Sequence, residues 1–288
     1  MTLITPFWGI LAVIASVVLF FLSSINIWIL LKGLRPLAYQ KFFRHYLYGF
    51  IVTLVAPGQM GDASLTLFLK KEGIPIRQSS VVYILDKSMT FLIFMSVSAW
   101  GAGLLFEPLR GIRWLVMVPL AGFVLFWTMA YCSLSFFARL NIFKKMDQWL
   151  EGAKDTLDIL KTRWDILAVN FILAWVKWGV LSLCYFFAFL AFQKWVDWPA
   201  IGIIPILSSL AGYIPISLSG IGITEMAAVY LFSLQGVEKS VVLSAYIFLR
   251  LIQFAMAGIV LLFFEKSNSF EKESILNEPA VLADGESR

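Results

Sequence analysis

Six ionisable side chains lie inside long apolar segments of this sequence. They are Asp62, Asp86, Lys87, Lys177, Glu225 and Arg250. Each such charge costs about 2.5 to 3.5 kcal/mol at the centre of a lipid-exposed helix, so these side chains are expected to face the interior of a bundle. Three acids and three bases allow two kinds of chemistry. They can pair with one another and lock the bundle, or they can bind a substrate head group or a coupling ion.

Two of the acids, Asp62 and Glu225, each follow a run of helix-breaking residues. The breaks are Pro57, Gly58 and Gly61 before the first acid and Pro215, Gly220 and Gly222 before the second. Half-helices that end at such breaks leave backbone groups free, and their N-terminal ends favour anions. Both acids are therefore candidates for a proton or cation coupling site, and Glu225 is the leading one. The alternative is that each acid only caps the returning helix.

The bases Lys87 and Arg250 are candidates for contact with a lipid phosphate. An ammonium binds phosphate as a point charge, and a guanidinium binds it through two parallel hydrogen bonds. Asp86 adjoins Lys87 but points about 100° away around a helix, so neither base has an obvious acid partner nearby in the sequence. The neutral residues Tyr213, Asn170 and Gln253 are candidates for substrate contact or for hydrogen bonds between helices.

The elements that carry these residues are predicted to be membrane helices. Of 288 residues, 60% are hydrophobic and 14% are charged, whereas soluble domains carry about 25% charged residues. The net charge of +5 arises from Lys and Arg in loops beside apolar runs, as in the cytoplasmic loops of membrane proteins, so nucleic-acid binding is not expected. Two cysteines, one histidine and the lack of nucleotide or hydrolase motifs predict no metal and no cofactor, and favour a transporter over an enzyme.

The apolar runs predict an all-α polytopic membrane protein with about five full spans and two re-entrant helical hairpins in an inverted-repeat arrangement. The predicted spans are residues 7–31, 79–106, 115–138, 166–192 and 240–264. The predicted hairpins are residues 46–69, which enter from the cytoplasm, and residues 198–236, which enter from outside. Non-helical backbone is tolerated at membrane depth only where protein buries it or it lines a wet cavity.

The basic loops also predict the orientation of the chain. A membrane domain of residues 1–264 is expected in the cytoplasmic (inner) membrane, with the N-terminus outside and a polar, flexible tail of residues 265–288 in the cytoplasm. Within it, residues 139–165 predict an amphipathic helix whose apolar stripe includes Ala153, Leu157 and Leu160. This helix is expected either to lie on the inner leaflet or to pack against the bundle or a second copy of the chain.

A weak repeat connects the two interrupted regions. Residues 163 positions apart match at Gly73 and Gly236, Tyr83 and Tyr246, Lys87 and Arg250, and Phe91 and Phe254. Chance identity in apolar sequence is one explanation. The other is a pair of halves with opposite orientations, and interrupted segments in two such halves indicate the midplane site of a transporter.

The motifs at residues 56–62, Ala-Pro-Gly-Gln-Met-Gly-Asp, and at residues 215–225, Pro-Ile-Ser-Leu-Ser-Gly-Ile-Gly-Ile-Thr-Glu, resemble those of the lysylphosphatidylglycerol synthase transmembrane-region, or flippase-like, family. The resemblance covers most of the chain. It implies a domain that moves anionic or aminoacylated lipids, or polyprenyl-phosphate-linked sugars, between leaflets. The chain departs from the family where Gln59 and Leu65 replace a common Arg and Asp62 replaces Glu.

The expected function is therefore translocation of a lipid or lipid-linked anion by alternating access. The expected partner is a membrane lipid with an anionic head group or a polyprenyl-phosphate-linked substrate, while a cytoplasmic transferase partner and an oligomer are left open. Aminoacylation of lipid by this chain is not expected, because only a short tail follows the last span. The alternatives are a membrane-embedded lipid-phosphate transferase or phosphatase, and a non-catalytic membrane partner of a glycosyl or aminoacyl transferase.

Overall fold

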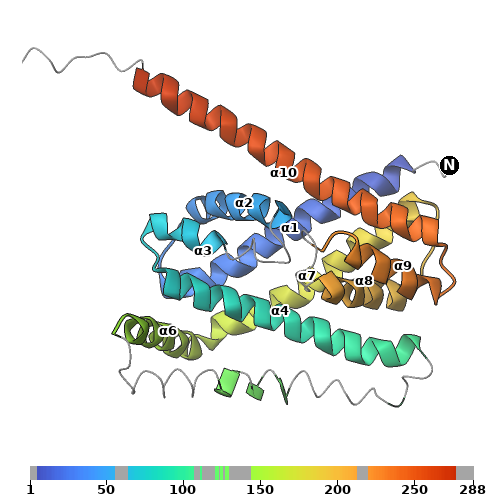
Figure 1. Ribbon diagram of the computed structural model, residues 1–288, viewed down its shortest axis with the longest axis horizontal. Helices are drawn as coiled ribbons and strands as arrows, with labels where there is room; N and C mark the ends of the chain where they lie inside the picture. Colours follow the sequence, from blue (N-terminus) through green and yellow to red (C-terminus); the bar gives the residue numbers. More distant parts are fainter. Residues whose placement is uncertain are drawn as a thin grey trace, which may run out of the picture.

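The computed structural model describes residues 5–55, 64–106, 144–212 and 220–276, with a few residues between 111 and 129. Every regular element in these ranges is a helix (Figure 1). The elements are α1 (Pro6–Leu34), α2 (Tyr39–Val55), α3 (Ser64–Leu69), the 3-10 helix η2 (Lys70–Glu72), α4 (Ile76–Leu105), α6 (Lys144–Thr162), α7 (Trp164–Ala191), α8 (Trp198–Gly212), α9 (Ile223–Ser233) and α10 (Lys239–Leu276). The predicted all-α polytopic fold is confirmed.

Four helices are long and apolar enough to cross a membrane: α1, α4, α7 and the first part of α10, Lys239–Leu262. They correspond to four of the five predicted spans, and most of the fifth, 115–138, lies outside the described residues. The short helices α2, α3, α8 and α9 have 17, 6, 15 and 11 residues. Each of these described helices is shorter than the about 20 residues that a spanning helix typically has.

The short helices pack in two pairs, α2 against α3 and α8 against α9. At the second pair the chain turns through Gly220 and Gly222, whose φ angles are +72° and +88°. A side chain at Gly220 would also meet the backbone of Gly212 at 3.0 Å, so both the conformation and the close approach require glycine. The predicted break is therefore confirmed at these two glycines, while Pro57, Gly58, Gly61 and Pro215 lie outside the described residues.

The turn before α4 and the turn before α10 have the same hydrogen bonds at a spacing of 163 residues. Gly73 and Gly236 both adopt the left-handed conformation, with φ angles of +75° and +72°. The matching backbone bonds are Ile74 N to Leu69 O and Val237 N to Phe232 O, Gly73 N to Lys70 O and Gly236 N to Ser233 O, and Ser79 N to Pro75 O and Val242 N to Glu238 O. The sequence matches thus coincide with the same local geometry, a helix that ends at a left-handed glycine and is followed by a new helix, which is a common way for helices to end.

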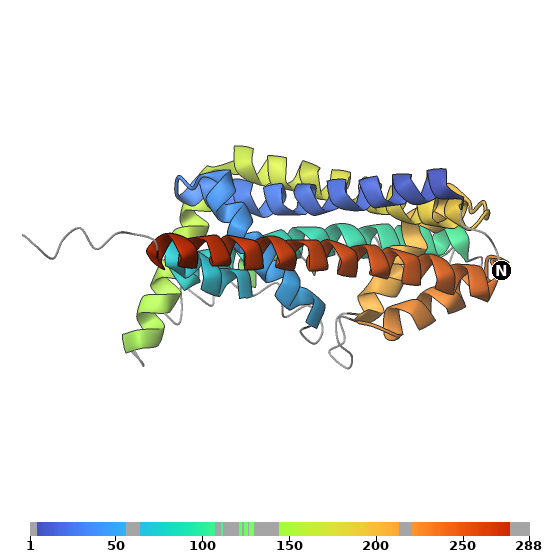
Figure 2. The same ribbon diagram turned by 90° about the horizontal axis from the view of Figure 1, so that it is seen from above.

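Two units of four helices, α1–α4 and α7–α10, make up most of the described molecule. Helices α1 and α7 lie side by side (Figure 2) and run antiparallel, because Thr5 N donates to Ala191 O at one end while Gly33 lies against Ile166 at the other. The short helices α2 and α3 therefore lie at one end of the molecule and α8 and α9 at the other (Figure 1). Contacts cross between the units, since α4 packs on α8 and α10 packs on α2.

Helix α6 packs against the bundle with the apolar stripe predicted from the sequence. Ala153, Leu157 and Leu160 are buried in a cluster with residues of α1 and α4, and Gly152 lies against the side chain of Arg77. For this part of the helix, the structure decides between the two expected roles in favour of packing on the bundle. Its bounds, Lys144–Thr162, lie within the predicted segment 139–165.

The two ends of the molecule differ in charge. Basic residues gather where α1 ends and α2, α4 and α7 begin, whereas the opposite end carries a mixed group of acids and bases. The basic set is Lys32, Arg35, Lys41, Arg44, Lys70, Lys71, Arg77, Lys161 and Arg163. Trp164 and Trp195 lie near opposite ends of α7 and are 76% and 67% exposed. This arrangement is typical of a multi-pass membrane protein whose tryptophans lie at the two interfaces.

Candidate functional site

The first polar site forms where α9 begins. Gly222 precedes the helix, and Glu225 follows three positions later, so its carboxylate can turn back to the helix start. Glu225 Oε2 accepts a hydrogen bond from Gly222 N at 2.7 Å, and Glu225 Oε1 accepts one from Arg250 Nε at 2.9 Å. The side chains of Glu225 and Arg250 are 9% and 20% exposed. The acid therefore caps α9 and pairs with the base at the same time.

This pair answers one question that the sequence left open. Arg250 has an acid partner, Glu225, which is not its neighbour in the sequence. The two residues are 25 positions apart, and it is the turn at Gly220 and Gly222 that brings the start of α9 against the first third of α10. A buried pair that is hydrogen-bonded on both sides tolerates the loss of one partner poorly, because the remaining charge is left uncompensated.

Two tyrosines continue this polar network into the bundle. Tyr246 lies one turn before Arg250 on α10, and its hydroxyl is 3.0 Å from the hydroxyl of Ser208 on α8. Its ring lies 4.8 Å from the ring of Tyr185 on α7, measured between centroids. Helices α7, α8, α9 and α10 therefore meet around one group of polar side chains.

A cavity of about 180 Å³ lies beside this network, between α1, α2, α7 and α10. Its polar lining comes from Ser16, Ser23, Tyr46, Tyr185 and Gln253, and the rest of its wall is mostly apolar. Both units contribute to the wall, so a molecule bound there would contact both. Gln253, a candidate for substrate contact, is thereby placed on a cavity wall.

The second polar site lies between α1, α4 and α7. Asp86 Oδ1 accepts hydrogen bonds from Asn26 Nδ2 at 2.7 Å and from Asn170 Nδ2 at 3.2 Å, and it lies 3.9 Å from Lys177 Nζ. The side chains of Asn26, Asp86 and Asn170 are buried. The structure thus brings together two of the predicted site residues, Asp86 and Lys177. Asn26 was missed, although it is an amide inside a run of 25 residues without a charge, and that signal could have identified it.

The remaining predicted residues have separate positions. Lys87 Nζ lies 5.6 Å from the centre of the Tyr83 ring, in a cation–π contact, and it occupies the position in α4 that Arg250 occupies in α10. Asp62 lies outside the described residues. At the basic end, His45 Nε2 lies 2.9 Å from Glu72 Oε1.

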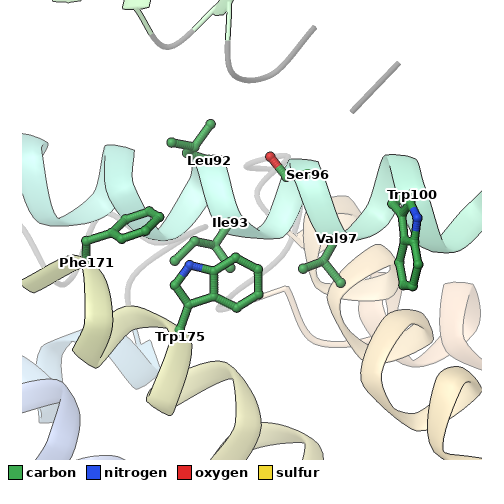
Figure 3. A pocket seen from close by; sticks show the side chains of 7 residues that line it. All are labelled: Leu92, Ile93, Ser96, Val97, Trp100, Phe171 and Trp175. Carbon is green, nitrogen blue, oxygen red and sulfur yellow. The ribbon is translucent and has the colours of Figure 1, made fainter. Parts of the chain in front are cut away.

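An apolar pocket of about 270 Å³ opens between α4 and α7. Figure 3 shows Phe171 and Trp175 extending from α7 toward Ile93 and Val97 of α4, with Trp100 at one end. The side chains that line it are aromatic or aliphatic apart from Ser96. Such a surface suits a hydrocarbon chain and offers little to a charged head group.

Within the described part of the chain, no three His, Cys, Asp or Glu side chains come together as a group that could hold a metal ion. Four of the six ionisable residues that the sequence singled out instead form two acid–base pairs, Asp86 with Lys177 and Glu225 with Arg250. The arrangement can bind an anion or a cation by exchange of partners within a pair.

Comparison with known proteins agrees with this architecture. Residues 1–260 match the family model described as the lysylphosphatidylglycerol synthase TM region. The chain is also similar to a UPF0104 membrane protein of Methanocaldococcus jannaschii, with 24% identity over 241 residues that cover 80% of this chain and 97% of the relative. No solved structure matches the chain. Because the family model extends over most of its length, the chain belongs to the lysylphosphatidylglycerol synthase TM region family.

Proposed function

We propose that this protein is a translocase of the cytoplasmic membrane. It moves a lipid with an anionic head group, or an anion linked to a polyprenyl lipid, from one leaflet to the other. The units α1–α4 and α7–α10 act as an inverted repeat, and access to the substrate site alternates between the two sides of the membrane.

The observation that supports this proposal most strongly is the matched construction of the two units. Their turns share hydrogen bonds at a constant spacing, α1 and α7 run antiparallel, and each unit places its last long helix on the first short helix of the other. Transporters with inverted repeats bind substrate where the broken helices of the two halves meet, and they rock one half against the other. Matched units suit such a cycle, because the same contacts can be remade with inside and outside exchanged.

The proposal assigns the basic end of the molecule to the cytoplasm, following the positive-inside rule. The pair α2 and α3 then enters and leaves the membrane from the cytoplasm, and the pair α8 and α9 does so from outside. The N-terminus is outside and the C-terminus inside. The lengths of these four helices support re-entrant hairpins, since each is shorter than a typical span.

We assign the phosphate of the lipid to Arg250 and Lys87, which hold matching positions in the two units. In the structure Arg250 is bound to Glu225. A phosphate is therefore expected to compete with the Glu225 carboxylate for the guanidinium. Because Glu225 also caps α9, this competition links substrate binding to the position of the second hairpin.

The two cavities suit different parts of a lipid. The polar-lined cavity beside Tyr185 has a volume of about 180 Å³, which is smaller than a typical pocket for a drug-sized ligand. We assign it to part of the head group. The apolar pocket at Phe171 and Trp175 is assigned to a hydrocarbon tail.

Reconstitution into liposomes tests the proposal directly. Purified protein is placed in vesicles that contain a trace of fluorescent phosphatidylglycerol, and a membrane-impermeant quencher reports which leaflet holds the dye. Without protein, the quencher should reach only the roughly half of the dye that lies in the outer leaflet. In vesicles that contain protein, we expect more than half of the dye to be quenched, because dye from the inner leaflet moves to the outer one. Arg250→Gln should slow the transfer, and Arg250→Lys should restore only part of it because the bidentate fork is lost.

Mass spectrometry of the same lipids distinguishes the alternatives. Transfer of an unchanged lipid supports the translocase. A chemically changed lipid contradicts it and supports a membrane-embedded transferase or phosphatase. If the lipid neither moves nor changes, while the protein retains its helical content, the proposal is wrong and a partner subunit becomes the better explanation.

A further inference from the structure

We infer that Asp86, Asn26 and Asn170 form a binding site for one small alkali cation, Na⁺, between α1, α4 and α7. The inference begins from the convergence of these side chains. Both amides lie within hydrogen-bond distance of the same carboxylate oxygen, Asp86 Oδ1, at 2.7 and 3.2 Å. Asn26, Asp86 and Asn170 are 0%, 1% and 0% exposed. Each comes from a different helix, so the bundle itself fixes the arrangement.

Two amide oxygen atoms beside Asp86 have no hydrogen-bond partner among the described residues. Within the part of the chain that the structure describes, neither Asn26 Oδ1 nor Asn170 Oδ1 accepts a hydrogen bond, although both are buried. A buried polar atom without a partner is costly, and native proteins rarely leave one. Here two of the same kind flank one carboxylate. A single bound species that attracts oxygen would satisfy both.

Rotation of the side-chain amide groups of Asn26 and Asn170 by 180° would direct their oxygens toward a bound cation. The rotation exchanges the amide nitrogen and oxygen, so both oxygens would then approach Asp86 Oδ1. Oxygens at that separation repel one another unless a cation lies between them. The rotation of Asn170 would also release the main-chain oxygen of Asn26, which now accepts a bond from Asn170 Nδ2 at 3.2 Å. The cation would therefore meet a carboxylate, two amide oxygens and a main-chain carbonyl.

The ligand set indicates which cation fits. Carboxylate and carbonyl oxygens suit hard cations and not the soft metals that thiolates and thioethers select. Only one of these ligands is charged, whereas Ca²⁺ sites are built largely from Asp and Glu carboxylates. Lys177 Nζ, 3.9 Å from Asp86 Oδ1, opposes a second positive charge still further. A monovalent cation is the best match.

The charged groups around Asp86 give this site a role in transport. Helices α1, α3, α6, α7 and α8 pack on α4, and neither α3 nor α8 carries an ionisable residue. The ionisable residues of α6 lie at the basic end, and Lys32 of α1 lies over the Trp28 ring. Asp86 and Lys177 together have no net charge, so bound Na⁺ would leave the group with one positive charge. This step rests on the proposed function: the added charge favours binding of the anionic lipid, which makes Na⁺ the coupling ion.

Thermal unfolding of the full-length protein in detergent tests binding without any need for transport. We expect the melting temperature to rise by about 5 °C in NaCl, in a saturable manner, relative to choline chloride or KCl at equal ionic strength. Asp86→Asn and Asn170→Ala should each abolish the rise. Lys177→Met should lower the half-saturating Na⁺ concentration at least about ten-fold, because a competing positive charge is removed. Ser182→Ala is the matched control, since Ser182 is a buried polar residue of α7 whose hydroxyl donates to Trp178 O one turn earlier, and it should keep the full rise.

Equal melting temperatures of the wild-type protein in all three salts would overturn the inference, and this comparison needs no variant to fold. The same equal melting temperatures are expected if a buried water molecule, and not a cation, occupies the site. The cation site and the translocase can each be contradicted without the other. Lipid transfer that is unaffected by Na⁺ contradicts the cation site and leaves the translocase standing, whereas a Na⁺-specific rise in melting temperature without lipid transfer contradicts the translocase and leaves the site standing.

Discussion

The ion pair between Glu225 and Arg250 offers a sharp test of how this bundle is held together. The perturbation is a pair of substitutions that remove the charge, Arg250→Gln and Glu225→Gln, made singly and together. In the first variant the Glu225 carboxylate keeps its bond from Gly222 N at 2.7 Å but loses the guanidinium at 2.9 Å. In the second variant Arg250 keeps its charge and loses the carboxylate. In the double variant neither buried charge remains.

The expected magnitudes follow from burial. With side-chain exposures of 9% and 20%, the pair lies close to the fully buried limit, where loss of one partner costs about 3 to 5 kcal/mol. We expect Arg250→Gln to cost about 3 kcal/mol and Glu225→Gln somewhat less, because the glutamine oxygen can still accept from Gly222 N. The double variant should be more stable than Arg250→Gln alone. The coupling energy is then expected to be about 2 kcal/mol.

Equilibrium unfolding in detergent with a chemical denaturant measures all four proteins under one condition. The control is the exposed pair of Arg163 and Asp165, whose Nε to Oδ1 distance is 3.2 Å and whose side chains are 48% and 65% exposed. The Arg163→Gln variant should have no measurable effect, because solvent screens an exposed pair. Additive effects at Glu225 and Arg250, with a coupling below about 0.5 kcal/mol, would refute the buried-pair reasoning.

Three further predictions concern the hairpins and the basic end. Gly220→Ala should destabilise the protein by about 1 to 3 kcal/mol in the same unfolding assay, because a φ of +72° strains a residue that has a side chain. The control Gly179→Ala, in the middle of α7 where no neighbouring atom would meet the added methyl group, should be neutral or stabilising. Equal effects of the two substitutions would contradict the turn geometry. Single cysteines at Arg35 and Glu72 should react with an impermeant thiol reagent from the same side of the membrane, and labelling from opposite sides would mean that residues 46–69 span it. The hydrogen bond with His45 holds the pKa of Glu72 below its ordinary value of 4.5. The stability that this bond contributes is therefore present above about pH 4.5 and is lost as the pH falls below that value. Glu72→Gln should flatten the pH dependence of the melting temperature in acid, and an unchanged pH dependence would count against the bond.

The proposed cycle relates these tests to one another. Glu225 is at once the cap of α9 and the partner of Arg250. In the proposed cycle, a lipid phosphate that binds the guanidinium would loosen the turn before α9. Asp86 holds Lys177 and two amides between the two units. Both polar groups join helices that must separate or slide if access alternates, which is why partner exchange at either group would affect the conformation of the whole bundle.

The sequence by itself determined the class of the fold and the position of its long helices. Bilayer thickness sets a minimum length for a span, so the apolar runs at 7–31, 79–106, 166–192 and 240–264 had to become α1, α4, α7 and α10. The break at Gly220 and Gly222 was also readable, because only glycine adopts the conformation found there at no cost. The matches 163 residues apart fall at two turns that share backbone hydrogen bonds.

Only the tertiary structure decided which polar groups meet. Asp86 and Asn26 are 60 positions apart, and Asp86 and Asn170 are 84 positions apart, so no local spacing relates them. Hydropathy determines that a buried charge must face inward, but the rotation of each helix and its neighbours determine which partner it finds. The stripe on α6 shows the same limit, since periodicity reveals an apolar face while packing against α1 and α4 decides what covers it. Partner choice is a property of the packed bundle, because it depends on distances between helices that are remote in the chain.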